Sequence, residues 1–290
     1  MEHASGHGGG VLSAGTDTTL AEARRTTQQV ARTFSLACRL LPAALRDDVY
    51  LLYLVFRTLD DLVDDGRSDA GARVAAVETW ARGAAAAPTR EVEILRDLSA
   101  RHDLPRDAML EFCAGMRSDL EAEVYSTEDD VDRYCYRVAG TVGVTMAALL
   151  GTTDRAAALP AAGALGMAMQ RTNILRDIDE DRARGRVYLA EASVARFGGR
   201  AALEPGNRGA LMRDQIARAD ALYEQGIPGV ALLRNGRRAV AAAAAMYREI
   251  LRQIEREGHG AQPGRAVVPL RRKLVVGARG VARSRRTALT

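Results

Sequence analysis

The stretch "NILRDIDED", residues 173–181, places four acidic residues and one arginine at the end of a segment that is otherwise largely apolar. Asn173, Asp177 and Asp181 are four positions apart, so two helical turns would align their side chains along one face. The apolar residues between them would lie on the other sides of that helix. This stretch therefore predicts a ladder of side-chain oxygens on a helix that packs against a core.

A second acidic pair lies far upstream, in "YLVFRTLDDLVDD" (residues 53–65). Asp60 and Asp64 are again four positions apart, at the end of a strongly apolar helical segment. Like charges at this spacing destabilise a helix by about 0.2–0.5 kcal/mol per pair, and carboxylates near a core cost more unless a cation neutralises them. Magnesium ions characteristically bind one or two carboxylates together with substrate phosphates. We therefore predict that the two ladders face each other across a site for Mg²⁺ and a diphosphate.

A solvated charged face is the alternative interpretation of each ladder. A single pair of acids four residues apart usually marks the exposed side of a helix. Arg182, Arg184 and Arg186 follow the second ladder and would neutralise it through local salt bridges. Salt bridging of this kind is not expected for the first ladder, so the two ladders together favour a cation site.

Apolar residues recur at three- and four-residue steps along most of the chain, which is the periodicity of amphipathic helices. The predicted helices cover residues 45–63, 72–85, 92–98, 108–124, 131–150, 156–178, 208–223 and 237–254. The acidic "STEDD" at residues 126–130 supplies Ser126 or Thr127 as the N-cap of the helix that follows. We predict one all-α domain over residues 19–260, preceded by a flexible tail (1–18) and followed by a basic tail (261–290).

The composition is that of an ordinary globular protein, with 47% hydrophobic and 27% charged residues among 290. Residues 1–15 lack the basic start and apolar core of a signal peptide, and residues 138–153, the longest uncharged stretch, are shorter than the about 20 residues that span a bilayer. We therefore expect a cytoplasmic protein. A net charge of +4 is modest, so no nucleic-acid partner is expected. The widely spaced thiols predicted to be buried are Cys38, Cys113 and Cys135.

The C-terminal "RRKLVVGARGVARSRR" (residues 271–286) mixes basic residues with Val and Leu. Such a segment would lie on an anionic membrane surface, giving peripheral membrane contact. A frayed, solvated tail is the other interpretation, and the one that we favour from the sequence.

Four stretches resemble the signature segments of the squalene and phytoene synthases in order and separation. They are "ARTFSLACRLLP" (31–42), "YLVFRTLDDLVDD" (53–65), "YCYRVAGTVG" (134–143) and "QRTNILRDIDEDRARGRVYL" (170–189). The resemblance extends over roughly residues 25–255. It implies an all-α class I isoprenoid synthase fold with a central cavity. It also implies a prenyltransferase that condenses two isoprenyl diphosphates, farnesyl or geranylgeranyl, head to head through a cyclopropylcarbinyl diphosphate.

The same resemblance implies roles for individual residues. The residues that would bind Mg²⁺ are Asp60, Asp64, Asn173, Asp177 and Asp181, and the four aspartates among them would be catalytic. The residues that would bind the substrate are Arg32, Arg57, Gln170, Asn173 and Arg186. Tyr134 corresponds to a tyrosine of the family that is implicated in proton handling or in guiding a carbocation, so it is also predicted to be catalytic.

The helix predicted from residue 131 would carry Tyr134, Val138 and Val142 on one stripe. These residues would form part of the wall of a dry, apolar pocket, in which a carbocation survives because water is excluded. Gly140 and Gly143 would either let two helices approach closely or leave room for a prenyl chain. The sequence does not favour one of these roles over the other.

The sequence leaves the product open. The first acidic motif is closer to that of squalene synthases, whereas the second is closer to phytoene synthases and to enzymes that stop at presqualene diphosphate. A Tyr-Asp pair common in the family is missing from "REGHGAQPGR" (residues 256–265), and Ala190 stands where many relatives have proline. No Gly-rich dinucleotide fingerprint is present, so NADPH is a possible cofactor that the sequence does not support.

Two further functions compete with the condensation. A class I terpene cyclase on the same scaffold would ionise a single prenyl diphosphate. A non-catalytic member of the family would act as an assembly or binding protein, but such a protein would not need both acidic ladders, and both are intact here.

Overall fold

The computed structural model describes residues 14–30, 32–121 and 123–286. The described chain is helical and contains no strand, which confirms the predicted all-α fold; its one isolated β-bridge joins Thr152 to Leu233. The α-helices are α1 (Ala14–Val30), α2 (Arg32–Cys38), α3 (Ala43–Asp64), α4 (Ala70–Ala81), α5 (Arg90–Arg101), α6 (Arg106–Leu120), α7 (Glu128–Cys135), α8 (Thr141–Leu150), α9 (Arg155–Ala183), α10 (Glu191–Arg196), α11 (Gly209–Gly226), α12 (Arg237–Arg256) and α13 (Leu270–Arg286). Between them lie a π-helical segment, η1 (Tyr136–Gly140), and two 3₁₀ segments, η2 (Gly199–Leu203) and η3 (Ile227–Leu232).

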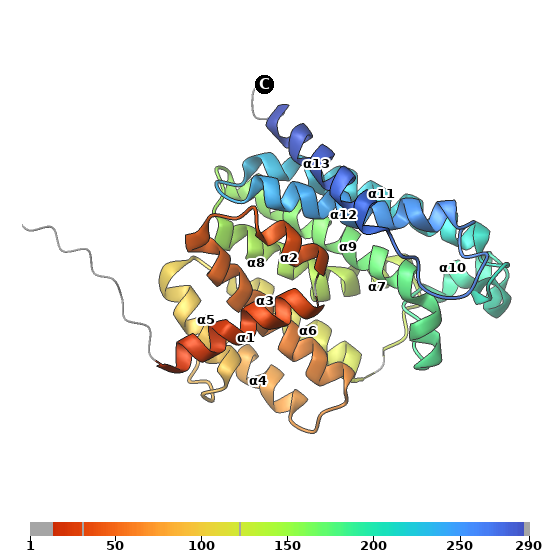
Figure 1. The fold of residues 1–290 in the computed structure, drawn as a ribbon. Coiled ribbons are helices and arrows are strands. Elements are labelled where there is room, and N and C mark those ends of the chain that lie inside the picture. The colour runs from red at the N-terminus through yellow and green to blue at the C-terminus, as the bar shows by residue number, and fades with distance from the viewer. Residues whose placement is uncertain (1–13, 31, 122, 287–290) are drawn as a thin grey trace, which may run out of the picture.

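Helix α9 is the central element of the fold. It packs against α7, η1 and α8 on one side and against α11, η3 and α12 on the other. Helix α3 organises the N-terminal part, where it packs against α1, α4, α5, α6 and α8. Figure 1 shows the helices of the N-terminal part in red to yellow and those from α9 onward in green to blue, and α8, in yellow-green, packs against both α3 and α9. The two helices that carry the acidic ladders are therefore the main packing elements of the protein.

Side-chain caps explain where several helices begin. The Thr127 hydroxyl accepts a hydrogen bond from the backbone N–H of Asp130, and the Asp130 carboxylate accepts one from the backbone N–H of Thr127. This reciprocal capping box confirms the cap that the sequence predicts at residues 126–130. Asp154 caps α9 in a similar way, by accepting a hydrogen bond from the N–H of Ala157.

The single helix predicted over residues 131–150 is interrupted, because η1 inserts a π-helical turn between α7 and α8. This part of the chain lies very close to α9. A Cβ atom built on Gly166 would lie 2.2 Å from the carbonyl oxygen of Ala139, and one on Gly143 would lie 2.3 Å from the carbonyl oxygen of Ala162. Of the two roles considered for the glycines of this segment, the structure therefore shows close helix approach.

The C-terminal part of the chain differs from the sequence-based expectation. Residues 270–286 form α13, which packs along α12 as an outer layer, so the prediction of a frayed tail is wrong for this segment (Figure 1). Two features explain the packing. Val276 and Val281 pack against a cluster of buried residues from α2 and α12, and Gly280 allows close approach because its Cβ would lie 2.7 Å from the carbonyl oxygen of Ala241.

The helical domain begins earlier in the sequence than predicted. Helix α1 begins at Ala14, so residues 14–18 of the predicted N-terminal tail are helical, while residues 1–13 lie outside the described residues. Cys38, Cys113 and Cys135 are buried and free, as predicted. Within the described ranges, no helix combines the length and the apolar composition needed to cross a membrane.

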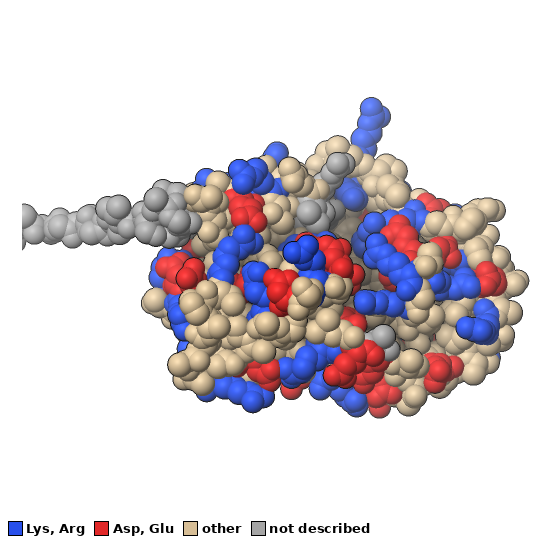
Figure 2. All heavy atoms as spheres, turned by 90° about the horizontal axis from the view of Figure 1, so that it is seen from below, with Lys and Arg blue, Asp and Glu red and all other residues tan. Residues whose placement is uncertain are grey.

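Charges of both signs are interleaved on the face that Figure 2 shows, and this face is hollowed near its centre. Nucleic-acid-binding proteins usually concentrate Lys and Arg in one patch. Here most charged groups are paired instead, with ion pairs such as Arg24–Asp47 (2.7 Å) and Arg248–Asp220 (2.7 Å) distributed over the surface. The charge pattern thus resembles that of an ordinary globular protein surface.

Candidate active site

Two connected spaces open between the central helices. An apolar cavity of about 380 Å³ lies among α2, α3, α6, α8, α9, η3 and α12. A polar cleft of about 960 Å³ adjoins it. The residues that line both spaces are Tyr53, Arg57, Asp60, Tyr134, Gln170, Asn173 and Tyr247. A bound molecule with a charged head and an apolar chain would therefore place its head in the cleft and its chain in the cavity.

Both acidic ladders line the polar cleft, so they do face each other as the sequence predicts. Asp60 and Asp64 enter from the C-terminal end of α3. Asn173, Asp177 and Asp181 enter from the C-terminal half of α9. The spacing of four residues keeps each set on the cleft side of its helix, while Ile178 on another side of α9 is buried in the core.

Arginines neutralise part of both ladders. Arg57 contacts Asp60 at 3.0 Å from within α3, and Arg186 reaches Asp64 at 3.3 Å. Within α9, Arg176 contacts Asp177 of the second ladder at 2.6 Å. The expectation that local salt bridges would explain only the second ladder is therefore wrong.

The positions of the arginines in the run 182–186 explain this outcome. Arg182 turns away from the cleft and pairs with Glu204, while Arg186 pairs with the first ladder and not with the second. Arg265, from the loop after α12, adds a contact to Asp177 at 3.0 Å. The neutralising charges thus come mainly from positions that lie outside the run 182–186.

Two carboxyl groups of the ladders, Asp60 and Asp181, have raised pKa values. Burial in the cleft, followed by the nearby charge of Asp64, raises the pKa of Asp60 to about 7. Burial, followed by the charge of Asp177, raises the pKa of Asp181 to about 6. Both groups lose protons less readily than an ordinary aspartic acid, because the folded protein leaves their negative charge incompletely compensated.

The oxygen atoms of the cleft suit a divalent cation. The Oδ1 atom of Asn173 is buried and has no hydrogen-bond partner, while its Nδ2 atom donates to Gln170 at 3.3 Å. An unpaired amide oxygen beside uncompensated carboxylates is a donor set that hard cations prefer. Within residues 14–286, apart from 31 and 122, no three acidic, His or Cys side chains come close enough to enclose an ion. Since Mg²⁺ typically binds one or two carboxylates together with phosphate oxygens and water, the cleft carboxylates and the Asn173 oxygen fit such an ion.

Basic side chains line the same cleft. Of the predicted substrate-binding residues, Arg57, Arg186, Gln170 and Asn173 are present there, whereas the side chain of Arg32 lies outside the described residues. Arg184, which the sequence suggested only as a local salt-bridge partner, also lines the cleft, and the basic residues that sequence reasoning missed are Arg176, Arg265 and Lys273. The last two belong to a loop and to α13, where no periodic pattern could place them at the site.

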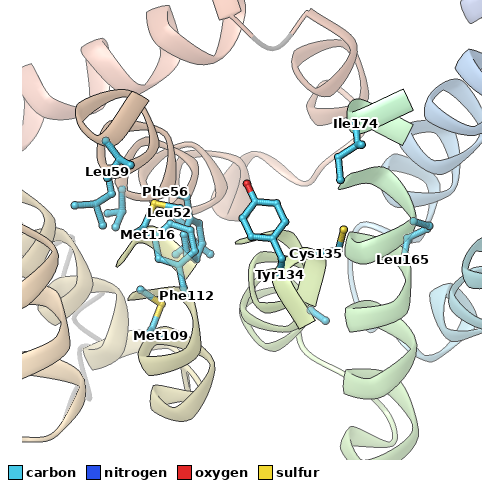
Figure 3. Close-up of a cluster of buried hydrophobic side chains, with 14 of the residues drawn as sticks. Leu52, Phe56, Leu59, Met109, Phe112, Met116, Tyr134, Cys135, Leu165 and Ile174 are labelled. Atoms are coloured by element: carbon cyan, nitrogen blue, oxygen red, sulfur yellow. The ribbon is translucent and has the colours of Figure 1, made fainter. Parts of the chain in front are cut away.

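Tyr134 lies at the border between the cleft and the cavity. Figure 3 shows its ring between the apolar side chains of α3 and α6, such as Phe56 and Phe112, and Ile174 of α9. A buried ion pair fixes α7 in this place, since Arg171 of α9 contacts Glu128 at 2.8 Å. The predicted stripe is also present, because Val138 and Val142 line the cavity with Tyr134.

Asp119, which lies beside Tyr134, was not singled out by sequence reasoning. Asp119 is buried on α6 and lines the cleft. The hydroxyl of Tyr134 donates to its carboxylate, at 3.1 Å from Oδ1 and 3.2 Å from Oδ2. Burial raises the pKa of Asp119 to about 6. Only one signal pointed to this residue, namely an acid on a helix face that is otherwise apolar.

The cavity beyond Tyr134 is apolar and lined by small side chains. Ala and Gly supply 11 of its 32 lining residues, and its charged lining groups, Arg57 and Asp60, lie at the border with the cleft. Phe56 and Phe112 meet edge to face, with ring centroids 4.7 Å apart. Such a pocket accommodates long hydrocarbon chains and keeps water away from a carbocation.

Without Mg²⁺, the protein is expected to become less stable as the pH rises from about 6 to about 8. The folded pKa of Asp60, about 7, and that of Asp181, about 6, exceed the ordinary value of 3.8. Their contribution to stability is therefore present at low pH and is lost as the pH rises through the folded values. Because water in the cleft screens these charges, we expect a loss of about 1 kcal/mol, or at least about 2 °C in Tm. Differential scanning calorimetry in EDTA at several pH values over this interval measures the change in Tm.

Added Mg²⁺ is expected to raise Tm more at the higher pH than at the lower one, because it binds the ionised carboxylates. The control is Ca²⁺- and Mg²⁺-free buffer of equal ionic strength. A Tm in EDTA that increases over this pH interval, or the same Mg²⁺ effect at both ends of it, would contradict this expectation.

Comparison with known proteins connects this geometry to a family. The family model described as "Squalene/phytoene synthase" matches residues 27–272. The chain is 36% identical over 276 residues to the 15-cis-phytoene synthase of Synechococcus elongatus, covering 87% of this chain and 89% of the relative. It is 38% identical over 241 residues to the phytoene synthase of Thermus thermophilus, covering 78% and 80%.

Solved structures agree with the sequence relatives. A crystal structure of a dehydrosqualene synthase with a ligand has a TM-score of 0.85 and 26% identity, covering 94% of this chain and 98% of that one. The squalene synthase HpnC of Alicyclobacillus acidocaldarius has a TM-score of 0.74 and 26% identity, covering 87% and 98%. The chain thus belongs to the squalene/phytoene synthase family and is a prenyltransferase that condenses two isoprenyl diphosphates head to head.

Proposed function

We propose that this enzyme forms a phytoene-type C40 hydrocarbon from two molecules of geranylgeranyl diphosphate, with Mg²⁺ as its cofactor. The observation that carries the choice of product is the sequence similarity, since the relatives at 36% and 38% identity are phytoene synthases. A phytoene-type product forms when the final cation loses a proton, so no NADPH is required.

The wall of the cavity supports the longer substrate. Alanine side chains from α8, α9 and α12, namely Ala147, Ala162 and Ala243, line the cavity, and larger side chains at these positions would reduce its volume. Two C20 chains need more apolar volume than two C15 chains. The cavity continues from the cleft at Tyr134 to Leu150 and Leu233 on its lining, which gives it depth as well as width.

The cleft residues are proposed to hold the diphosphate groups and their metal ions. The proposed Mg²⁺ ligands are Asp60, Asp64, Asn173, Asp177 and Asp181. Bound Mg²⁺ would supply positive charge that stabilises the leaving diphosphate. Arg57 and Arg186 would donate hydrogen bonds to diphosphate oxygens, because their guanidinium groups already face the carboxylates of this cleft. Gln170 would position Asn173 through the hydrogen bond between their amides.

Product analysis with both substrates tests the proposed product. Purified protein is incubated with Mg²⁺ and either geranylgeranyl or farnesyl diphosphate, with and without NADPH, and the extract is examined by mass spectrometry. We expect a C40 hydrocarbon, no dependence on NADPH, and a kcat/KM for the C20 substrate at least about tenfold higher, equivalent to about 1.4 kcal/mol. A preference for farnesyl diphosphate, or a product that changes with NADPH, would contradict the proposal.

We also propose that the enzyme is cytoplasmic and contacts an anionic membrane surface through α13. Leu270, Leu274 and Val275 expose 66%, 49% and 49% of their surface there. Arg271 and Arg279 lie on the same exposed side, and no acidic residue follows Glu257. A helix with exposed apolar side chains among basic ones is typical of interfacial binding. This surface also adjoins the cleft, which Lys273 of α13 lines.

Sedimentation with lipid vesicles tests this contact. We expect the protein to bind vesicles that contain phosphatidylglycerol at least about tenfold more tightly than vesicles of phosphatidylcholine alone, and to be released by salt. The double variant Arg271→Glu/Arg279→Glu should lose the difference. The double variant Arg200→Glu/Arg213→Glu, which has the same net charge, should keep it. Equal binding by the two double variants would contradict a specific role of α13.

A further inference from the structure

Asp119 belongs to neither acidic ladder, yet it is the acidic group nearest to the hydroxyl of Tyr134. It lies on α6 with only 8% of its surface exposed. Both of its carboxylate oxygens accept the Tyr134 hydroxyl, at 3.1 and 3.2 Å. The phenol proton of Tyr134 is therefore directed at this carboxylate. The side chain of Tyr134 lines both the cleft and the cavity, so it lies at their border.

A second tyrosine, Tyr188, also donates a hydrogen bond to Asp119. The Tyr188 hydroxyl donates to Oδ1 of Asp119 at 3.4 Å and accepts a hydrogen bond from Arg186 at 2.9 Å. The Tyr134 and Tyr188 rings stack with centroids 5.2 Å apart, which restricts the movement of both. The network thus connects the cavity border to an arginine of the diphosphate cleft.

The condensation requires a base at this border. When the cyclopropane ring of the intermediate forms, a carbon next to the cationic centre must lose a proton, and an apolar cavity offers few acceptors. Arginine is always protonated, and the ladder carboxylates serve the metal ions in the proposed function. Tyr134 lines the cavity, and its hydroxyl donates a hydrogen bond to the buried carboxylate of Asp119.

We propose that Asp119 takes up the phenol proton of Tyr134 while the Tyr134 oxygen removes a proton from the cationic intermediate. In this step the C–H bond breaks, its electron pair closes the cyclopropane ring, and the proton binds the Tyr134 oxygen. The proton that Tyr134 previously donated crosses to Asp119. The cation and the carboxylate are thereby replaced by a neutral ring and a neutral carboxylic acid, so charge and atoms balance. The inference rests on the proposed condensation and adds the residue that receives its proton.

Two properties of Asp119 support this role. Burial raises its pKa to about 6, so it accepts a proton more readily than an ordinary aspartate does. It also lines the polar cleft, where the proton can pass to water or to a released diphosphate. The charged or titratable groups that interact with it include Tyr134, Tyr188, Arg186, Asp64, Asp60 and Tyr125.

Asp119→Asn tests the proposal because an amide oxygen can still accept the Tyr134 hydroxyl but cannot take up its proton. We expect kcat to fall by about 100-fold, as for the loss of general base catalysis, with KM within about threefold of wild type. Asp119→Glu, which keeps a carboxylate, should retain at least about tenfold more activity than Asp119→Asn. Tyr125→Phe is the matched control. Its ring packs 5.0 Å from that of Tyr134, but its hydroxyl makes no hydrogen bond to Asp119 in the described chain, so kcat should change little.

A double-mutant cycle separates proton transfer from a structural effect. If Asp119 acts through Tyr134, Asp119→Asn should have no further effect on kcat in a Tyr134→Phe background. The proposal would be overturned if the two substitutions lowered kcat independently, so that their effects multiplied in the double variant. It would also be overturned if Asp119→Asn had the kcat of wild type or the same kcat as Asp119→Glu. If Asp119→Asn does not fold, Asp119→Glu and Tyr134→Phe still test the proposal. An equal loss of kcat in these two variants would contradict the role of a proton-accepting carboxylate at residue 119. Wild-type product formation tests the proposed function separately.

Discussion

Asp64→Asn and Asp177→Asn are each expected to lower kcat for the condensation by about 1,000-fold. Each substitution keeps the size of the side chain but removes one negative charge from the polar cleft that both residues line. These charges are the ones proposed to hold the Mg²⁺ ions that stabilise the leaving diphosphate. Steady-state kinetics with geranylgeranyl diphosphate at saturating Mg²⁺ measure the loss.

Asp65→Asn is the matched control, because Asp65 follows Asp64 directly but is exposed and does not line the cleft. It should change kcat by less than about threefold. The Mg²⁺-dependent increase in Tm should also disappear in Asp64→Asn and Asp177→Asn and persist in Asp65→Asn. Either cleft variant with normal kcat and a normal Mg²⁺ response would show that the ladders do not bind the metal.

Gly166→Val is expected to lower the free energy of unfolding by about 3 kcal/mol or more. Any Cβ at this position would lie 2.2 Å from the carbonyl oxygen and 2.7 Å from the carbonyl carbon of Ala139. Because the clashing atoms are backbone, no side-chain rotation relieves the contact, and α9 must move away from η1. Chemical denaturation measures the change, with urea midpoints compared at unchanged slope.

Gly71→Ala is the corresponding control within a helix. Its Cβ would meet no atom within 4 Å, and its backbone already has ordinary helical geometry. We expect this variant to be as stable as wild type or more stable by up to about 1 kcal/mol, since alanine has the higher helix propensity. If Gly166→Val were tolerated as well as Gly71→Ala, the close approach of α9 and η1 would not be a requirement of the fold.

Close helix packing and metal binding act on the same part of the molecule. The close approach at Gly143 and Gly166 brings η1 and α8 against α9, which gives the cavity a continuous wall of backbone and small side chains. The ladders line the polar cleft that adjoins this cavity. Burial of Asp60, followed by its repulsion by Asp64, raises the pKa of Asp60, so the ionised ladders destabilise the metal-free protein, and bound cations would offset this effect. Binding of the cofactor and stability of the cleft are therefore linked.

Sequence periodicity predicted the helices that contribute to the core because their burial requires an apolar stripe. The helix predicted at residues 45–63 lies at 43–64, and that predicted at 237–254 lies at 237–256. The ladders were recognisable for a similar reason, since acids four residues apart beside an apolar face are unusual. The capping box at Thr127 was predicted from local chemistry alone.

Features that depend on contacts between distant segments were missed. Helix α13 is strongly basic and has no acidic residue, so its packing on α12 depends on small residues such as Gly280 that give no periodic signal. Arg265 reaches Asp177 across 88 positions of sequence. Asp119 becomes significant only because α7 places Tyr134 beside it. Each of these relations is produced by the assembled fold and not by a local pattern.

The ratio of diphosphate released to hydrocarbon formed decides whether the enzyme joins two substrate molecules. Purified enzyme is supplied with Mg²⁺ and geranylgeranyl diphosphate, and both products are quantified in the same reaction. Head-to-head condensation predicts two diphosphates for each hydrocarbon molecule and a carbon number twice that of the substrate. One diphosphate released for each C20 product would contradict the condensation and identify the enzyme as a cyclase of single prenyl diphosphates.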